Sequence, residues 1–236
     1  MRPIEGGLAR VGELDYCPRL MTRKLSLTVD GRNVVVQLHK GDLPADVKFN
    51  GAVAVDSETL GLSLVRDPLC LVQISDGGGE AHLVQLDRGS YDAPNLKRVL
   101  TDPSVLKLFH FARFDVAMFM RDLGVVCAPI YCTKIASKLV RTYTDRHGLK
   151  DLVKEVLGRD LSKEQQSSDW GAAELSDAQL AYAASDVLHL HALKARLDAM
   201  LARVGRTELA AATFAYLPTR ARLDLAGFED MDIFSH

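Results

Sequence analysis

Residues 51–60, Gly-Ala-Val-Ala-Val-Asp-Ser-Glu-Thr-Leu, decide the fold prediction for this chain of 236 residues. From Gly51 to Ser57 the stretch is apolar nearly throughout, which is typical of a strand buried on both faces in the middle of a sheet. Asp56 and Glu58 end this strand. Because side chains two apart on a strand point to one face, both carboxylates are expected to converge at its carboxyl end. Taken alone, they fit an ordinary strand exit into a polar loop better.

Strands and helices are predicted on both sides of this segment. An N-terminal hairpin, residues 25–29 and 34–38, turns at Asp30-Gly31, where glycine supplies the positive φ of a tight turn. Strands are further expected at 69–75, 82–86, 105–109 and 130–132, and helices at 95–100, 111–123, 149–157 and from Ser176 to about Val204. Helix is also expected through Ala215, and an irregular tail from Leu217-Pro218. The pattern predicts an α/β protein with a mixed five-stranded sheet flanked by helices.

The domain prediction is one domain over residues 24–236, preceded by an N-terminal extension over residues 1–23. Two interpretations of the extension stay open: a disordered segment, or a misassigned start if Met21 is the true initiator. No run approaches the roughly 18 apolar residues of a membrane span. The four scattered cysteines lack zinc or disulfide spacing, so we expect no membrane association and a cytoplasmic location.

The charge balance limits the nucleic-acid partners that the chain can hold. Lys and Arg total 29 and Asp and Glu total 31, for a formal charge of −2. A protein that grips long nucleic acid through its phosphates usually carries a basic excess. Any nucleic-acid substrate is therefore expected to be short or anchored by metal. The basic residues between Lys134 and Lys150 are either a solvated helix face or a local surface for phosphate or for subunit contact.

Further carboxylates are expected to join Asp56 and Glu58. Asp115 lies in the first turns of the helix after strand 105–109, where acids commonly just balance the helix dipole. Tyr182 and Asp186 share one helix face at i and i+4. Four carboxylates brought together cannot all ionise without cations between them. Hard divalent ions suit these ligands, and a pair of them serves in-line phosphoryl displacement, so the predicted chemistry is phosphodiester hydrolysis.

Asp56-x-Glu58, His110-x-x-x-Phe114-Asp115 and Tyr182-x-x-x-Asp186 resemble the three ordered motifs of the DEDD superfamily of 3′-to-5′ exonucleases, in the branch with Tyr in its third motif. Wider stretches resemble the nanoRNase C family, compact relatives of ribonuclease D that degrade very short RNA. They are residues 56–62, 132–138, 141–150 and 165–170 and the tail 232–236. The resemblance runs from about Val35 to His236 and implies a ribonuclease H-like fold and a homo-octamer.

The resemblance also implies residue roles. Asp56 would bridge two divalent cations, Mg²⁺ or Mn²⁺; Glu58 and Asp186 would complete one site, and Asp115 would serve the other largely through water. Tyr182 would position the attacking water. The expected substrate contacts are Thr59, Leu60, Gly61, Leu62, His110, Phe111, Phe114 and Trp170. Leu62 is either a wedge between bases or a cap on the sheet edge, His110 a substrate donor or scaffold, and Trp170 a site residue or a core anchor.

The function expected from these observations is a metal-dependent 3′-to-5′ exoribonuclease that hydrolyses short oligoribonucleotides, with dinucleotides preferred, to nucleoside 5′-monophosphates. Residues 202–236 leave no room for the extra helical domains of ribonuclease D. Activity on longer RNA, such as tRNA 3′ trimming, or on DNA stays an alternative. A non-catalytic nucleic-acid-binding scaffold would need a lost carboxylate, and none is lost.

Overall fold

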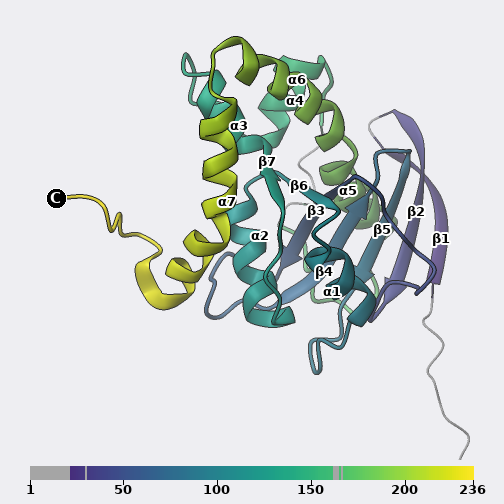
Figure 1. The fold of residues 1–236 in the computed structure, drawn as a ribbon. Helices are drawn as coiled ribbons and strands as arrows, with labels where there is room; N and C mark the ends of the chain where they lie inside the picture. The colour runs from purple at the N-terminus through teal and green to yellow at the C-terminus, as the bar shows by residue number, and fades with distance from the viewer. Residues whose placement is uncertain (1–21, 30, 162–164, 166) are drawn as a thin grey trace, which may run out of the picture.

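The computed structural model describes residues 22–29, 31–161, 165 and 167–236. The predicted N-terminal extension, residues 1–23, lies outside this part of the chain except for Thr22 and Arg23, which begin the first strand. The described residues form one domain (Figure 1). Among them, no helix is both long enough and apolar enough to cross a membrane.

A single mixed sheet runs through the described part of the chain, with its seven strands in the order β1-β2-β5-β4-β3-β6-β7. The strands are β1 (Thr22–Val29), β2 (Arg32–Lys40), β3 (Ala52–Thr59), β4 (Leu69–Ser75), β5 (Glu80–Gln85), β6 (Leu106–Phe109) and β7 (Ile130–Cys132). β3, β4 and β5 pair antiparallel, whereas β6 and β7 continue the sheet parallel to β3. The predicted α/β class with a mixed sheet is confirmed.

The N-terminal hairpin adds two strands to the five that were predicted as the sheet. β1 and β2 pair antiparallel with Val29 opposite Arg32, and Gly31 has the positive φ, 74°, that the tight turn requires. β1 is the edge strand, as expected of the hairpin, but β2 pairs parallel with β5. The hairpin is therefore part of the main sheet and places the carboxyl ends of β2 and β5 next to each other.

Helices cover the sheet and cluster beyond its β7 edge. They are α1 (Pro94–Thr101), α2 (Ala112–Met118), α3 (Thr133–Val140), α4 (Leu149–Leu157), α5 (Asp177–Leu188), α6 (Leu190–Arg203) and α7 (Thr207–Leu223), with π-helical turns η1 (Phe119–Leu123) and η2 (Asp224–Phe228). α5 packs across strands β1 to β5. α2, α3 and α7 lie together at the opposite end of the sheet from the hairpin (Figure 1).

The core lies between the sheet and these helices. Every residue of β4 is buried, as expected for a central strand with apolar side chains on both faces. Fully burying a side chain such as Leu71, Ile74 or Leu83 contributes about 1.5–3 kcal/mol. This burial holds β3, the neighbour of β4, rigidly in the middle of the sheet.

The prediction of one helix from Ser176 to about Val204 is wrong, because the chain bends at His189 (φ −103°, ψ −12°) between α5 and α6. α5 follows the sheet, whereas α6 packs against α3 and α4. No glycine or proline marks the bend. Apolar residues continue at helical spacing through the bend. The sequence pattern therefore did not predict that the chain leaves the sheet at His189 and packs against other helices beyond it.

The predicted irregular tail from Leu217 is also wrong, because α7 continues through Pro218 to Leu223. A proline inside a helix costs about 3 kcal/mol. Ala210, Phe214, Leu217 and Ala221 bury one face of α7, and the Phe214 ring lies 4.6 Å from the Tyr131 ring. Burial of the two large side chains, at about 1.5–3 kcal/mol each, offsets the proline.

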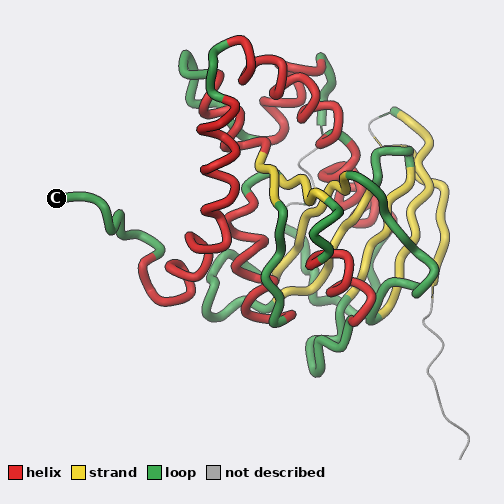
Figure 2. The backbone as a smooth tube through the Cα atoms, viewed as in Figure 1, coloured by secondary structure: helices red, strands yellow, loops and turns green. Residues whose placement is uncertain are grey.

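An ion triad joins the end of the chain to α2. The buried carboxylate of Asp224 accepts hydrogen bonds from Arg113 at 2.6 and 2.8 Å and pairs with Arg220 at 2.9 Å. Arg113 lies on α2, so the triad fixes the C-terminal segment against that helix. Beyond η2, the carbonyl of Glu229 accepts hydrogen bonds from Arg113 and Arg220, and the chain then ends away from the domain (Figure 2).

Candidate active site

The first two acidic side chains of the site come from β3. Asp56 pairs in register with Gln73, and the strand then bulges between Glu58 and Thr59 as the chain leaves the sheet. Ligand oxygens of Asp56, Glu58 and Asp186 all lie within 4.8 Å of one another. The convergence expected from the strand spacing therefore includes a residue more than a hundred positions away.

Asp115 reaches the site because the chain turns sharply between β6 and α2. Phe111 makes this turn in the left-handed region (φ 73°, ψ 42°), which is rare and strained for a residue with a side chain. Asp115 follows in the first turn of α2, only 3% exposed. Ser57 Oγ donates a 2.6 Å hydrogen bond to Asp115 Oδ1, which brings α2 against the end of β3.

α5 supplies the remaining predicted catalytic side chains. It begins at Ser176, where the predicted capping box forms in both directions with Gln179. Ala183 and Ala184 are fully buried, and such small side chains let the helix lie close to the sheet. Tyr182 and Asp186 then share the face that borders the carboxylates of β3.

Burial raises the pKa of three carboxyls of this cluster, and neighbouring negative charges add to the rise at two of them. Burial, and then the charges of Asp115, Asp186 and Glu58, raise the pKa of Asp56 well above its usual range. Burial, followed by Asp186, raises the pKa of Glu58 to about 9. Burial raises the pKa of Asp115 to about 7, against the opposing effect of the Ser57 hydrogen bond. These carboxyl groups cannot all be ionised together unless positive charge lies between them, and divalent cations would supply that charge.

The phenol of Tyr182 stays protonated at neutral pH. Its pKa is raised by burial and then by the negative charges of Asp186, Glu58 and Asp56. A protonated phenol can donate a hydrogen bond but is no base by itself. Its ring lies 6.1 Å from the ring of Trp170, at an angle of 37°.

A cleft of about 330 Å³ brings most of the predicted site residues together. Those that line it are Asp56, Glu58, Thr59, Leu62, His110, Phe111, Phe114, Asp115, Tyr182 and Asp186. Leu60, Gly61 and Trp170 are not among the described residues that line this cleft. Leu60 is 47% exposed beside it, and Trp170 is buried against Tyr182.

His110 is anchored in the wall of the cleft. Its Nδ1 lies 2.8 Å from Thr133 Oγ1, and that hydroxyl donates to the Phe109 carbonyl at 3.0 Å. Because the single hydroxyl hydrogen is used there, Nδ1 is assigned as the protonated nitrogen. Burial lowers the pKa of His110 to about 3, so the ring is neutral. Its Nε2 has no hydrogen-bond partner in the described part of the chain.

Several residues of the cleft were not among the predicted site residues: Ser57, Lys134, Gly148, Leu149, Lys150 and Leu161. The basic run pointed to Lys134 and Lys150, whereas nothing in the sequence singled out Ser57 or Leu161. Lys134 Nζ lies 4.0 Å from the centre of the Phe111 ring. Arg141, from the same basic run, is fully buried and bonded to Glu155, so this run divides into cleft residues and scaffold.

Known proteins are similar to this chain in sequence and in fold. Residues 39–202 match the family described as 3′-5′ exonuclease. The NrnC structure from Brucella melitensis is 55% identical, with a TM-score of 0.83 and coverage of 85% of this chain and 98% of that one. The chain belongs to the nanoRNase C family of DEDD-type 3′-to-5′ exonucleases. Structures of Brucella melitensis NrnC with bound Mg²⁺ and bound to pGG match this nanoRNase C chain with TM-scores of 0.81 and 0.82.

Ribonuclease D proteins are similar to part of this nanoRNase C chain. The ribonuclease D of Gluconacetobacter diazotrophicus is 36% identical over 165 residues, which are 70% of this chain and 42% of that protein. The chain thus spans less than half the length of this curated relative. Residues 39–202, which match the exonuclease family, include Asp56, Glu58, Asp115, Tyr182 and Asp186.

Proposed function

We propose that the protein is a metal-dependent 3′-to-5′ exoribonuclease that hydrolyses short oligoribonucleotides, with dinucleotides preferred, to nucleoside 5′-monophosphates. The observation that carries this proposal is the meeting of Asp56, Glu58 and Asp186 oxygens within 4.8 Å. Burial and then the neighbouring negative charges raise the pKa values of Asp56 and Glu58, which supports a site for cations rather than for a neutral ligand.

The residues present fit two divalent cations, Mg²⁺ or Mn²⁺. Asp56, Glu58 and Asp186 would hold one of them, and Asp56 with Asp115 would hold the other. When bound, the pair would stabilise the charge that develops on the attacking and leaving oxygens of a phosphodiester. The Mg²⁺ bound to Brucella melitensis NrnC supports the choice of a hard cation. Carboxylate oxygens suit Mg²⁺ and Mn²⁺ alike.

The remaining side chains of the cleft would hold substrate and water. Tyr182, protonated at neutral pH, would donate a hydrogen bond that orients the attacking water. Leu62, 83% exposed, and Phe111, 44% exposed, offer apolar surface on which bases of any sequence can stack. Lys134 and Lys150 line the same cleft and would attract substrate phosphates.

The short-substrate preference rests on size and charge. A cleft of about 330 Å³ has room for few nucleotides, and the net charge of −2 provides no extended basic grip for long RNA. Brucella melitensis NrnC is bound to pGG, a two-nucleotide ligand. The homo-octamer and the cytoplasmic location stay predictions.

Hydrolysis of matched substrates tests the proposal. The full chain is mixed with Mg²⁺ or Mn²⁺ and with labelled RNAs of two and of twenty nucleotides, beside the corresponding DNA dinucleotide. We expect faster turnover of the RNA dinucleotide, no turnover with EDTA, and loss of turnover in Asp56→Asn. Equal turnover of both RNA lengths would remove the short-substrate preference.

Activity on longer RNA is the second candidate, because the ribonuclease D of Gluconacetobacter diazotrophicus is 36% identical over the matched residues. Faster turnover of the twenty-nucleotide RNA in the same experiment would favour it. RNA binding without hydrolysis in the presence of either metal would instead favour a non-catalytic scaffold.

A further inference from the structure

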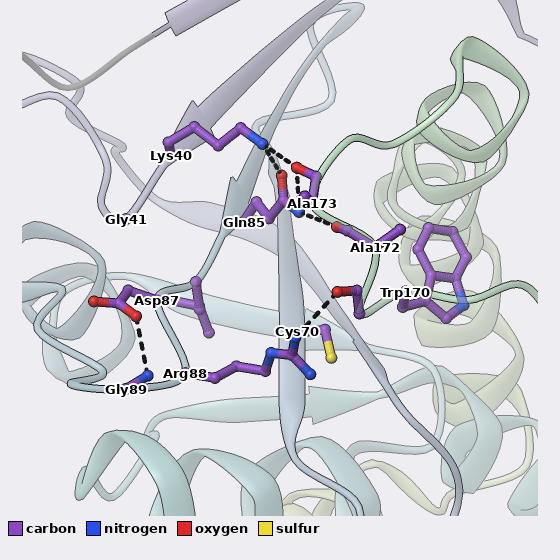
Figure 3. Close-up of a pocket in the computed structure, with 12 residues that line it drawn as sticks. Lys40, Gly41, Cys70, Gln85, Asp87, Arg88, Gly89, Trp170, Ala172 and Ala173 are labelled. Atoms are coloured by element: carbon purple, nitrogen blue, oxygen red, sulfur yellow. Dashed lines mark hydrogen bonds between the residues drawn. The ribbon is translucent and has the colours of Figure 1, made fainter.

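Side chains from the carboxyl ends of β2 and β5 hold the chain that leads into α5 by its backbone carbonyls (Figure 3). Arg88 Nη2 donates to Gly171 O at 3.0 Å, Gln85 Nε2 to Ala172 O at 2.8 Å, and Lys40 Nζ to Ala173 O at 2.6 Å. Lys40 Nζ also donates to Gln85 Oε1 at 2.6 Å, which joins two of these donors. We call these three side chains and three carbonyls the carbonyl latch.

The carbonyl latch borders a second cleft of about 420 Å³, separate from the one that contains the carboxylates. A charged and an amide side chain in a cleft could indicate a ligand site. Here Lys40 and Gln85 already donate to protein oxygens, as Figure 3 shows. Their arrangement therefore points to holding the backbone of residues 171–173 in place.

Two side-chain ends lie close to the backbone of the same segment at Gly171. A Cβ atom on Gly171 would lie 2.6 Å from Leu60 Cδ2 and 3.0 Å from Arg88 Nη1. Only glycine lets the backbone pass between these two side chains without displacing them. The backbone at Gly171 thus passes close to Leu60, and the hydrogen bonds of the carbonyl latch hold the carbonyls of residues 171–173.

Trp170, the residue before the carbonyl latch, depends on that path. Its side chain is 2% exposed, and its indole N–H has no hydrogen-bond partner within the described residues. Packing and the backbone therefore set the position of the ring. The ring centre lies 6.1 Å from that of Tyr182, which lines the carboxylate cleft while Trp170 does not.

We infer that Lys40 and Gln85, with Arg88, are positioning residues for Tyr182 and act on it through the backbone of residues 171–173 and the ring of Trp170. The inference rests on the proposed function, in which Tyr182 orients the attacking water. A displacement of about 1 Å at such a group can lower the rate about 100-fold. None of the three side chains lines the carboxylate cleft, so their effect on the reaction passes through Tyr182.

Kinetics of the double variant Lys40→Met/Gln85→Leu test the inference. This variant frees Ala172 and Ala173 but leaves the Arg88 contact beside Leu60. With Mg²⁺ and an RNA dinucleotide, we expect kcat to fall about tenfold, from partial displacement of Tyr182, with KM little changed. Lys48→Met, which removes an exposed lysine from the loop before β3, is the matched control and is expected to keep wild-type kcat.

A double-mutant cycle separates positioning from general destabilisation. Tyr182→Phe lacks the hydroxyl that the carbonyl latch is inferred to position. When Lys40→Met/Gln85→Leu is added to Tyr182→Phe, we therefore expect no further loss of kcat. If the loss is the same in both backgrounds, or if kcat does not change in either, the inference is overturned.

Fluorescence gives a readout that does not need activity. Trp170 is the only tryptophan of the chain, so emission excited at a wavelength that tyrosine does not absorb reports the surroundings of this ring alone. Opening the carbonyl latch is expected to shift this emission to longer wavelength, whereas Lys48→Met leaves it unchanged. An unshifted emission in Lys40→Met/Gln85→Leu overturns the inference. If the wild-type chain hydrolyses no RNA but the shift occurs, the proposed function fails and the carbonyl latch stands.

Discussion

The hydroxyl of Ser57 donates a 2.6 Å hydrogen bond to the carboxylate of Asp115. Ser57 lies between Asp56 and Glu58 on β3, whereas Asp115 lies on α2, so this bond joins the first acidic motif to the second. It also opposes the rise in the pKa of Asp115 that burial causes. One small side chain therefore contributes both to the geometry and to the charge of the site.

Replacing this hydroxyl should weaken cation binding. In Ser57→Ala, Asp115 loses a hydrogen bond that favours its ionised form. Loss of such outer partners typically costs about 10- to 100-fold in metal affinity. We expect the Mg²⁺ concentration for half-maximal activity to rise within that range, measured by titration at saturating RNA dinucleotide. Ser57→Thr keeps a hydroxyl and is expected to stay near wild type; an unchanged requirement in Ser57→Ala contradicts the role.

Asp56→Asn should abolish hydrolysis without unfolding the protein. Because Asp56 is proposed to contact both cations, we expect activity to fall at least about 100-fold. The metal-free variant should melt no lower than wild type at pH 8, since one of the mutually repelling carboxylates is gone. Activity is followed with labelled dinucleotide and melting by calorimetry. Full hydrolysis by Asp56→Asn would refute the assignment.

The metal-free protein should lose stability as the pH rises. In the folded state the pKa of Glu58 is raised to about 9 and that of Asp115 to about 7. At any pH between the ordinary pKa of an unfolded carboxyl and these raised values, the folded state therefore binds more protons than the unfolded state. The stability from this binding is full below about pH 4 and is lost as the pH passes these folded-state values. In EDTA, we expect the melting temperature to fall from pH 5 to pH 9. Glu58→Gln should flatten the fall, and saturating Mg²⁺ should oppose it; a flat wild-type profile in EDTA would contradict the pKa shifts.

Tyr182→Phe should lower kcat far more than it changes KM. The variant keeps the ring that packs on Trp170 and removes only the hydroxyl proposed to orient water. General acid–base and orienting groups typically contribute about 10²- to 10⁴-fold. Because the pKa of Tyr182 is raised, no increase in rate from phenol ionisation is expected up to pH 10. Steady-state kinetics from pH 6 to pH 10 measure both effects, and a wild-type kcat in Tyr182→Phe would contradict the role.

Leu62→Ala should weaken substrate binding and leave the fold intact. Leu62 is 83% exposed at the cleft, so its truncation removes little buried surface, and melting should stay near wild type. Stacking on a base is worth about 1–3 kcal/mol, which corresponds to a rise in KM of about 5- to 150-fold for an RNA dinucleotide. The control is Val65→Ala. Val65 is 89% exposed, and it is not one of the described residues that line the cleft. Equal KM values for both variants would argue against the wedge.

The sequence predicted the centre of the sheet and the acidic cluster because both depend on local pattern. The apolar stretch 51–57 had to be buried, and the spacing of Asp56 and Glu58 put both on one face of β3. Tyr182 and Asp186 followed from helical spacing. The meeting of these elements needed the resemblance as well, since no local rule places α5 against the end of β3.

What the sequence did not predict depends on tertiary contacts. The bend at His189 arises where α6 leaves the sheet for α3 and α4, and the helix through Pro218 persists because its apolar face is buried. The contributions of Ser57 and of the carbonyl latch rest on single hydrogen bonds between distant segments. Small and long polar side chains of this kind look the same in sequence whether they are solvated or paired.

Because Arg113 pairs with Asp224, the helical turn η2 near the end of the chain helps to hold α2 in place. Arg113 lies on the helix that carries Asp115, and a chain cut before residue 224 would remove the carboxylate with which its guanidinium pairs. Shortening this protein from its C-terminal end would thus loosen the attachment of α7 to the helix that carries a proposed cation ligand. Engineered fusions are better attached at the C-terminal residue, because Arg113 and Arg220 still bind the backbone carbonyls of Glu229 and Met231.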